Sequence, residues 1–309
     1  MENRFASFYE HRDESGAGNL EKIRENQKII RRVAGTDKSR SFEAAPGSPF
    51  CDGRVYENGK LIGFGIHIFN EDVYPLQSFE IYLRSCGLTG ELDLSDCRDL
   101  VFVDLYHNKI EKIGTKNLPS LRIFGVQDNA LTELDVSGMP ACQGIDAGRN
   151  RLRRIDVSHN PELVELYVNG NTLTEIDLTH NPKLKYFYCH ENPMTRLDTR
   201  ANPLLRHLNA TYNPLKEIFS LAPQREEPLP LTLKAGEGGY VGLKFNPVYN
   251  AQWKETGQWQ QTYFAYPRGG CAFAGWVDER GDTVSREEVW VDRYGESRVL
   301  TAVFEPDVN

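Results

Sequence analysis

One interval of 21 residues runs through the middle of this chain. Six asparagines recur at that interval: Asn108, Asn129, Asn150, Asn171, Asn192 and Asn213. Five prolines keep step with them: Pro119, Pro140, Pro161, Pro182 and Pro203. An ordinary globular core does not require such a period, whereas a structure in which one coil repeats along an axis does. The interval therefore predicts a solenoid, in which each coil buries its apolar face against its neighbours.

Apolar residues keep fixed places within each repeat. If Leu163 is position 1, then Leu166 is position 4, Val168 is position 6, Asn171 is position 9 and Leu173 is position 11. Positions 4 and 6 have the spacing of a β-strand, and the whole pattern is that of a leucine-rich repeat. Each unit is thus expected to form a short strand, a tight turn at the asparagine and an extended return.

We predict about seven such coils in residues 78–219, as one right-handed solenoid with a single parallel sheet over residues 80–212 and little helix. The first coil, around residues 81–94, has one residue more than the others. The asparagines are expected to be structural, since asparagine tolerates unusual backbone angles and can satisfy buried turn groups. Inward-pointing cysteines should behave as small apolar residues; they are Cys86, Cys97, Cys142 and Cys189.

The flanks predict further segments. Residues 1–49 are polar and are expected to carry one helix, over residues 19–34. In residues 50–77, Asn58-Gly59 separates two apolar runs, which is typical of a β-hairpin; we assign this hairpin to capping the first coil. After the last repeat, aromatic and β-branched residues predict a separate small all-β domain over residues 225–309. The fold class is therefore mostly β.

Two family resemblances rest on these residues. The repeats, with the recurring phrase LTELDVS…NPxL, resemble bacterial leucine-rich repeat proteins of the internalin-like and gut-anaerobe type. The tail resembles the divergent internalin B-repeat, which implies a β-grasp-like module of exported surface proteins that acts as a spacer or adhesive part. Its matching residues are Phe273, Gly275, Trp276, Gly281, Leu300, Ala302 and Phe304. The stretch Pro247–Tyr266 departs from that family by being longer and richer in tryptophan and glutamine.

Charge and hydropathy exclude several partners. The net charge is −8 and no segment is strongly basic, which argues against nucleic acid. No run of apolar residues is long enough to insert into a membrane. The first residues lack the apolar region of an export signal, which predicts a cytoplasmic protein unless a signal was removed. The resemblance to internalins implies instead a secreted or cell-surface protein.

The motifs of catalysis do not occur. The sequence has no glycine-rich phosphate loop, no His-Glu-x-x-His and no nucleophile elbow, and its cysteines lack zinc-ligand spacing. His159 and His180 recur with the repeat and are interpreted as turn residues. The aspartates that recur on the return stretch are interpreted as a solvated row; they are Asp135, Asp156, Asp177 and Asp198. We expect no enzyme, no cofactor and no metal site.

The sheet surface carries the aromatic residues. Between residues 100 and 215, six of the eight aromatics fall on positions 2, 3, 5, 7 and 8, which form the concave face. Tyr167 and Tyr188 share one position in adjacent coils and should stand side by side. Exposed aromatics among polar neighbours are typical of binding surfaces. The predicted partner-binding residues are Phe102, Tyr106, Tyr167, Tyr186, Tyr188, His190, His207, Asn209 and Tyr212.

Charges of both signs surround these aromatics and favour a protein or glycan partner over a polyanion. The leading hypothesis is a non-enzymatic binding protein whose concave face holds the partner, with the tail as spacer or second contact. A structural or scaffold protein without a dedicated partner is the alternative, because aromatics also suit the surface of a sheet. An enzyme with its site in the tail is a third possibility, weakened by the absence of histidine there.

Overall fold

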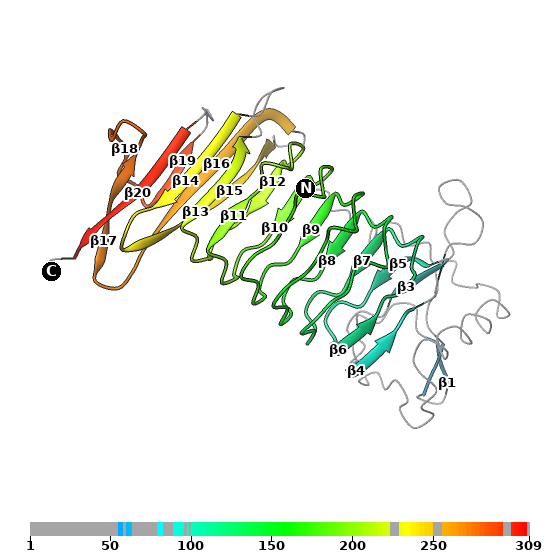
Figure 1. Cartoon of the computed structure of the whole chain (residues 1–309). Helices are drawn as coiled ribbons and strands as arrows, with labels where there is room; N and C mark the ends of the chain where they lie inside the picture. Colours follow the sequence, from blue (N-terminus) through cyan, green and yellow to red (C-terminus); the bar gives the residue numbers. More distant parts are fainter. Residues whose placement is uncertain are drawn as a thin grey trace.

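The chain folds as a leucine-rich repeat solenoid whose strands stack along one axis (Figure 1). The structure, a computed structural model, describes residues 55–57, 60–63, 79–82, 89–95, 98, 100–222, 229–249, 255–292 and 298–307. Every regular element in that part of the chain is a strand, which confirms the mostly β fold class. The helix expected over residues 19–34, and the rest of residues 1–49, lie outside the described residues.

Seven parallel strands form the concave side of the solenoid. They are β3 (Phe79–Tyr82), β5 (Leu100–Asp104), β7 (Ile123–Gly125), β8 (Gly144–Asp146), β9 (Glu165–Tyr167), β10 (Tyr186–Tyr188) and β12 (His207–Asn209). From β5 onward, each residue pairs with the residue 21 places later, as Glu165 does with Tyr186. Between β3 and β5 the offset is 22, because Ile81 pairs with Val103. The sequence period is thus the register of the sheet.

The opposite side of the solenoid holds additional strands. β4 (Thr89–Asp93) pairs in parallel with β6 (Lys109–Gly114), and β11 (Arg196–Asp198) pairs in parallel with β13 (Glu217–Ala222). The expectation of a single parallel sheet was therefore incomplete. The return stretches of neighbouring coils lie close enough to form short ladders at the two ends of the array.

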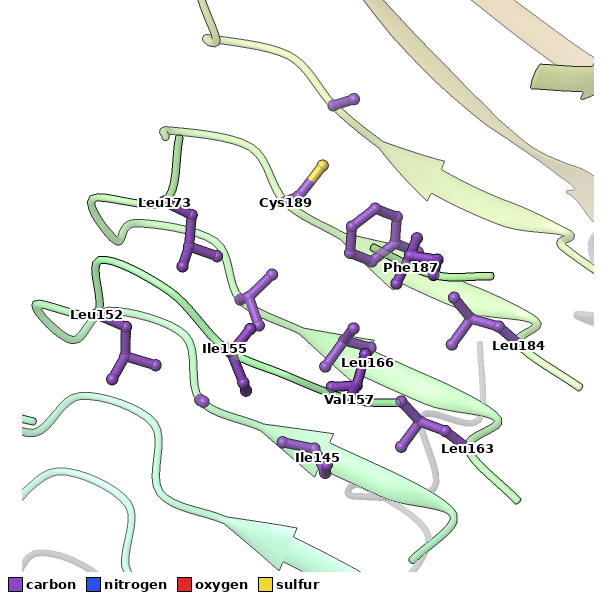
Figure 2. Packing of buried hydrophobic residues seen from close by; sticks show 14 of the residues in the cluster. Ile145, Leu152, Ile155, Val157, Leu163, Leu166, Leu173, Leu184, Phe187 and Cys189 are labelled. Carbon is purple, nitrogen blue, oxygen red and sulfur yellow. The ribbon is translucent and has the colours of Figure 1, made fainter. Parts of the chain in front are cut away.

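The core is a column of apolar side chains enclosed by the coils. Figure 2 shows leucines from successive coils pointing into the interior beside Phe187 and Cys189. Leu163, Leu166 and Phe187 are fully buried, as their repeat positions predict. Cys142 and Cys189 are also fully buried, and burial raises the pKa of the Cys142 thiol to about 12. Cys86 and Cys97 lie outside the described residues.

The asparagine series forms a ladder of hydrogen bonds between coils. The side-chain amide of Asn171 donates to the carbonyl oxygens of Ala147 and Val168, each at 3.0 Å. Its Oδ1 atom accepts from the backbone N–H of Leu152 at 2.9 Å. Asn150 and Asn192 repeat the pattern in the neighbouring coils. These bonds satisfy buried backbone groups, so the structural role predicted for the series is confirmed.

The residue before each asparagine, rather than the asparagine itself, takes the unusual backbone angle. All six of these residues have a positive φ: His107, Asp128, Arg149, Gly170, Glu191 and Tyr212. Only one is glycine, although the left-handed region costs other residues roughly 1 kcal/mol. The neighbouring asparagine ladder holds the turn in this shape.

A second asparagine ladder runs along another edge of the coils. Asn160, Asn181 and Asn202 precede the repeating prolines and are at most 1% exposed. The Asn181 amide donates to the carbonyl oxygens of Val157 and Asn160, at 2.9 and 3.0 Å. The sequence shows these residues in register at Asn-Pro turns, but their ladder was not predicted. It ties each turn to the coil before it.

The tail strands continue both sides of the solenoid. They are β14 (Leu229–Ala235), β15 (Gly239–Tyr249), β16 (Glu255–Pro267), β17 (Cys271–Val277), β18 (Thr283–Ser285), β19 (Val289–Asp292) and β20 (Arg298–Pro306). β15 pairs antiparallel with β12 and extends the concave sheet to ten strands; β14 pairs antiparallel with β13. A domain boundary near residue 225 stays a prediction, but the strands on its two sides share hydrogen-bonded sheets.

Trp276 lies at the centre of the tail. Its side chain is fully buried, and its Nε1–H donates to the carbonyl oxygen of Glu287 at 3.1 Å. Leu300 and Ala302 are fully buried as well, while Phe273 and Phe304 pack edge to face at the rim. Trp276, Leu300 and Ala302 thus belong to the same apolar core as the repeats, and Phe273 and Phe304 pack against it.

The N-terminal hairpin is present. β1 (Val55–Glu57) and β2 (Lys60–Gly63) pair antiparallel on either side of Asn58-Gly59, the sequence signal that predicted them. Its assignment as a cap for the first coil stays a prediction.

Candidate binding face

Tyr167 and Tyr188 stand side by side on the concave face, as their shared repeat position predicts. They lie on adjacent strands β9 and β10, in register with each other. Their rings are stacked, with centroids 5.1 Å apart and planes 9° from parallel. Both side chains are half-buried. Desolvation, and the nearby Glu165 carboxylate, raise the pKa of Tyr167, so its hydroxyl stays protonated and donates to Glu165 Oε2 at 3.4 Å.

A second stacked pair lies beside the first. Tyr186 and His207 occupy another shared position, and their ring centroids are 4.4 Å apart with planes 13° from parallel. His190 meets Tyr188 edge to face at 6.4 Å. We call these five residues the tyrosine cluster: Tyr167, Tyr186, Tyr188, His190 and His207. The cluster spans strands β9, β10 and β12 and gathers five of the nine predicted residues.

His207 differs from its prediction as a surface residue, because it is fully buried under Tyr186. Neither ring nitrogen has a hydrogen-bond partner among the described residues. Desolvation, with Arg206 nearby, lowers the pKa of His207 to about 4. Desolvation also lowers the pKa of His190. His207 is therefore an uncharged ring at neutral pH, and it packs against the ring of Tyr186.

Phe102 was predicted to be exposed, and this prediction is wrong. Its side chain is only 2% exposed, and all five residues of β5 are buried. Strands buried on both faces read as continuous apolar runs, and residues 100–103 are such a run, Leu-Val-Phe-Val. This apolar run indicates that the concave face is covered at β5. The repeat position of Phe102 alone could not show this.

The remaining predicted residues lie at the margins. Tyr106 is half-buried and follows β5, so strands β7 and β8 separate it from the tyrosine cluster. Asn209 is half-buried on β12, where its Oδ1 accepts from the Thr211 hydroxyl at 2.8 Å. Tyr212 is 68% exposed, beside the cluster. The structure therefore divides the predicted site into a covered end and an open end.

Tail residues that the sequence analysis did not include also lie on this face. Tyr266, on β16, has its ring centroid 5.9 Å from that of Tyr212. Its hydroxyl oxygen accepts from the backbone N–H of Tyr212 at 3.4 Å. Nothing in the 21-residue period could indicate this contact, because the two residues are 54 apart in a region where the period has ended.

The recurring aspartates of the opposite side have a local structural role. Asp156 Oδ1 accepts from the backbone N–H of Ser158 at 2.9 Å, and Asp177 Oδ1 does the same for Thr179. Hydrogen bonds from the residue two places on hold the pKa of each carboxylate below its usual value. Both side chains are exposed, as expected for a solvated row. These contacts fix turns and offer no acid–base pair.

Two further properties hold for the described residues. They contain no group of three or more histidine, cysteine, aspartate or glutamate side chains placed to hold a metal ion. They also contain no helix long and apolar enough to span a bilayer. The tyrosine cluster itself consists of aromatic rings that carry hydroxyl or imidazole groups.

Comparison with known proteins gives likenesses of fold. No family model matches the chain, and no curated protein matches it. Among solved structures, the functional domain of InlJ from Listeria monocytogenes is 19% identical, with a TM-score of 0.42; the match covers 73% of this chain and 59% of that one.

Two further bacterial proteins are similar over smaller parts. YopM, a leucine-rich effector protein from Yersinia pestis, is 20% identical with a TM-score of 0.34, covering 47% of this chain and 48% of YopM. A leucine-rich repeat protein of Leptospira interrogans is 21% identical with a TM-score of 0.31, covering 32% of this chain and 27% of that one. The chain spans less than two thirds of the length of each of these three proteins.

Proposed function

We propose that this chain is a non-enzymatic binding protein that holds a protein or glycan partner on its concave face, at the tyrosine cluster. The observation that carries the proposal is the pair of ring stacks Tyr167–Tyr188 and Tyr186–His207, placed side by side on neighbouring strands. The resemblance of the repeats to internalin-like proteins supports a secreted or cell-surface setting.

Three physical properties support binding at this place. The rings are already ordered by stacking, so a partner that contacts them loses little side-chain entropy. Tyrosine joins a large apolar area to a hydroxyl, which suits hot spots in interfaces. The three tyrosine rings are half-buried, so part of each ring is open to a partner while the rest is held by its neighbours.

The test compares two double variants of the full chain. Tyr167→Ala with Tyr188→Ala removes one ring stack; Arg153→Ala with Glu175→Ala changes two exposed residues of the return stretches. The parent chain is screened on a glycan array and against bacterial and host protein extracts. Any captured partner is then titrated against both variants, with melting temperatures recorded to show that each is folded.

The tyrosine variant should weaken binding by at least about 2 kcal/mol, because central aromatics typically cost that much on truncation. The return-stretch variant should bind as the parent does. A tyrosine variant of unchanged affinity would contradict the proposal and favour the scaffold alternative or a different face.

A further inference from the structure

The concave face does not end with the last coil. β15 pairs with β12 so that Lys244 lies opposite Asn209, and opposite residues of an antiparallel pair share one face. The next residues of β15, Leu243 and Phe245, are buried on the core side. The concave surface therefore continues from the repeats onto the tail without a break in the sheet.

The same alternation extends across β16 and β19. Phe264 and Val289 lie opposite each other, as do Thr262 and Val291, while Tyr263 points to the core. Val289 is 51% exposed and Val291 is 40% exposed. Five large hydrophobic residues are exposed in the described part of the chain; three lie on this continuous face or at its edge, namely Tyr212, Val289 and Val291.

Aromatic contacts join the two parts. Phe264 stacks on Tyr266 with centroids 6.1 Å apart and planes 7° from parallel, and Tyr266 meets Tyr212 of the last coil. Gly242 lies beneath this row, because a Cβ atom there would be 3.0 Å from the Tyr266 ring. A glycine at this place lets the tyrosine lie across β15 toward the solenoid.

Cationic side chains lie around the part of the concave face that runs from the tyrosine cluster to the tail. Lys185, Arg206 and Lys244 are exposed around the tyrosine cluster and the tail aromatics. Of the nearby acids, Glu191 is exposed, Asp146 is half-buried beside Tyr167, and Glu165 is 2% exposed in contact with the Tyr167 hydroxyl. The fully exposed charges at this place are therefore mostly positive, on a chain whose net charge is −8.

We propose that β15, β16 and β19 complete the binding face and that its occupant is an acidic protein segment. Aromatic or aliphatic side chains of that segment would contact Phe264, Val289 and Val291, and its carboxylates would face the flanking cations. Exposed valines favour a protein over a glycan, since aliphatic side chains offer a hydroxyl-rich sugar no hydrogen bond. The inference rests on the proposed function and gives the tail a share in binding beyond that of a spacer.

The experiment selects short random peptides, displayed on phage, against the full chain. Enriched peptides are synthesised with a fluorescent label and titrated by anisotropy. The tail variant is Val289→Ser with Val291→Ser, two exposed residues whose change should leave the fold intact. Phe264→Ala is a second tail variant, and Lys244→Glu tests charge. The matched control is Val284→Ser, an exposed valine on β18 of the other sheet.

Enriched peptides should combine aspartate or glutamate with aromatic or aliphatic residues. The tail variants should weaken the binding of these peptides at least about ten-fold, because apolar contact is lost. Lys244→Glu should weaken them too, most clearly at low salt. Val284→Ser should bind as the parent does.

Other outcomes separate the two proposals. Peptides weakened only by the Tyr167→Ala, Tyr188→Ala variant would leave the proposed function standing and overturn the role of the tail. Peptides whose affinity is unchanged by every concave-face variant would contradict both proposals. Basic peptides, no enriched peptide, or binding seen only on a glycan array would overturn the acidic protein segment as occupant.

Discussion

Asn171 and Ala147 are 24 residues apart in the sequence and are joined by a 3.0 Å hydrogen bond from the Asn171 side-chain amide to the Ala147 carbonyl oxygen. The same amide also donates to Val168 in its own coil. From Asn129 to Asn213, each asparagine of this series therefore bonds its own coil to the coil before it. The consequence is that neighbouring coils should lose stability together when one asparagine is removed.

Asn171→Ala should lower the free energy of unfolding by roughly 1–3 kcal/mol, because buried backbone groups lose their partners. Urea denaturation followed by circular dichroism measures the change. Asn169→Ala, at a half-exposed place two residues earlier, is the control and should have little effect. Equal stability of Asn171→Ala and the parent would show that the ladder contributes nothing.

Asn181→Ala should destabilise less than Asn171→Ala. The Asn181 amide makes two hydrogen bonds, and its Oδ1 is buried without a partner among the described residues. Removing Asn181 thus deletes one unsatisfied atom along with the bonds, whereas Asn171 has partners on both side-chain atoms. The same urea titrations rank the two variants, and the reverse order would contradict this reading of the second ladder.

Glu191→Gly should stabilise the chain by up to about 1 kcal/mol, while Glu191→Val should destabilise it. Glu191 is exposed with a φ of 58°, where glycine has no steric cost and a β-branched residue has the largest. Glu175→Gly, at an exposed residue that lacks a positive φ, is the control and should not stabilise. Melting temperatures of the three variants decide the matter.

His207 should make the chain less stable in acid. The unfolded chain binds a proton on this histidine near pH 6.5, whereas the folded chain binds it only near pH 4. The stability is therefore present above pH 6.5 and is lost as the pH falls toward 4, by up to about 3 kcal/mol. His207→Phe keeps a ring beside Tyr186 and should flatten this dependence.

The measurement is the free energy of unfolding at several pH values between 7 and roughly 4.5. His159→Gln, at an exposed turn, is the control and should follow the parent. If His207→Phe showed the same slope as the parent, His207 would not be buried as an uncharged ring.

Cys142 and Cys189 should react slowly with thiol reagents in the folded chain. Both are fully buried, and desolvation raises the pKa of each thiol, so little reactive thiolate is present. Cys271 is partly exposed and should be labelled sooner. Site-resolved mass spectrometry after short exposure to iodoacetamide measures the order. Early labelling of Cys189 would mean that its coil opens readily or that its side chain points outward.

The repeat alone predicted the strands and which side chains they bury. Because the period equals the sheet register, knowing that Leu166 is buried also places Phe187 in the core. The same reasoning placed Tyr167 beside Tyr188. It failed for Phe102, because a repeat position says which face a side chain is on but not whether that face is covered.

In the tail, the 21-residue period no longer predicts which segments contact each other. The pairing of β12 with β15 and the contact between Tyr212 and Tyr266 join segments that do not share a repeat. Long-range antiparallel pairing leaves no spacing in the sequence that could be counted. Trp276 was singled out by the resemblance to the B-repeat, but that resemblance did not predict which sheets its strand would join.

The uniform register from β5 to β12 has a consequence for how such a chain can evolve. Any interior coil presents the same pairing edge to the coils on either side, so a duplication of 21 residues could be inserted there without changing a neighbour's partners. Each such insertion would lengthen the face by one strand spacing, about 4.8 Å. At the end of the array, β12 is committed to the antiparallel β15. Coils can therefore be added within the array. An addition at its C-terminal end would separate β12 from β15 and interrupt the row of aromatic rings that continues onto the tail.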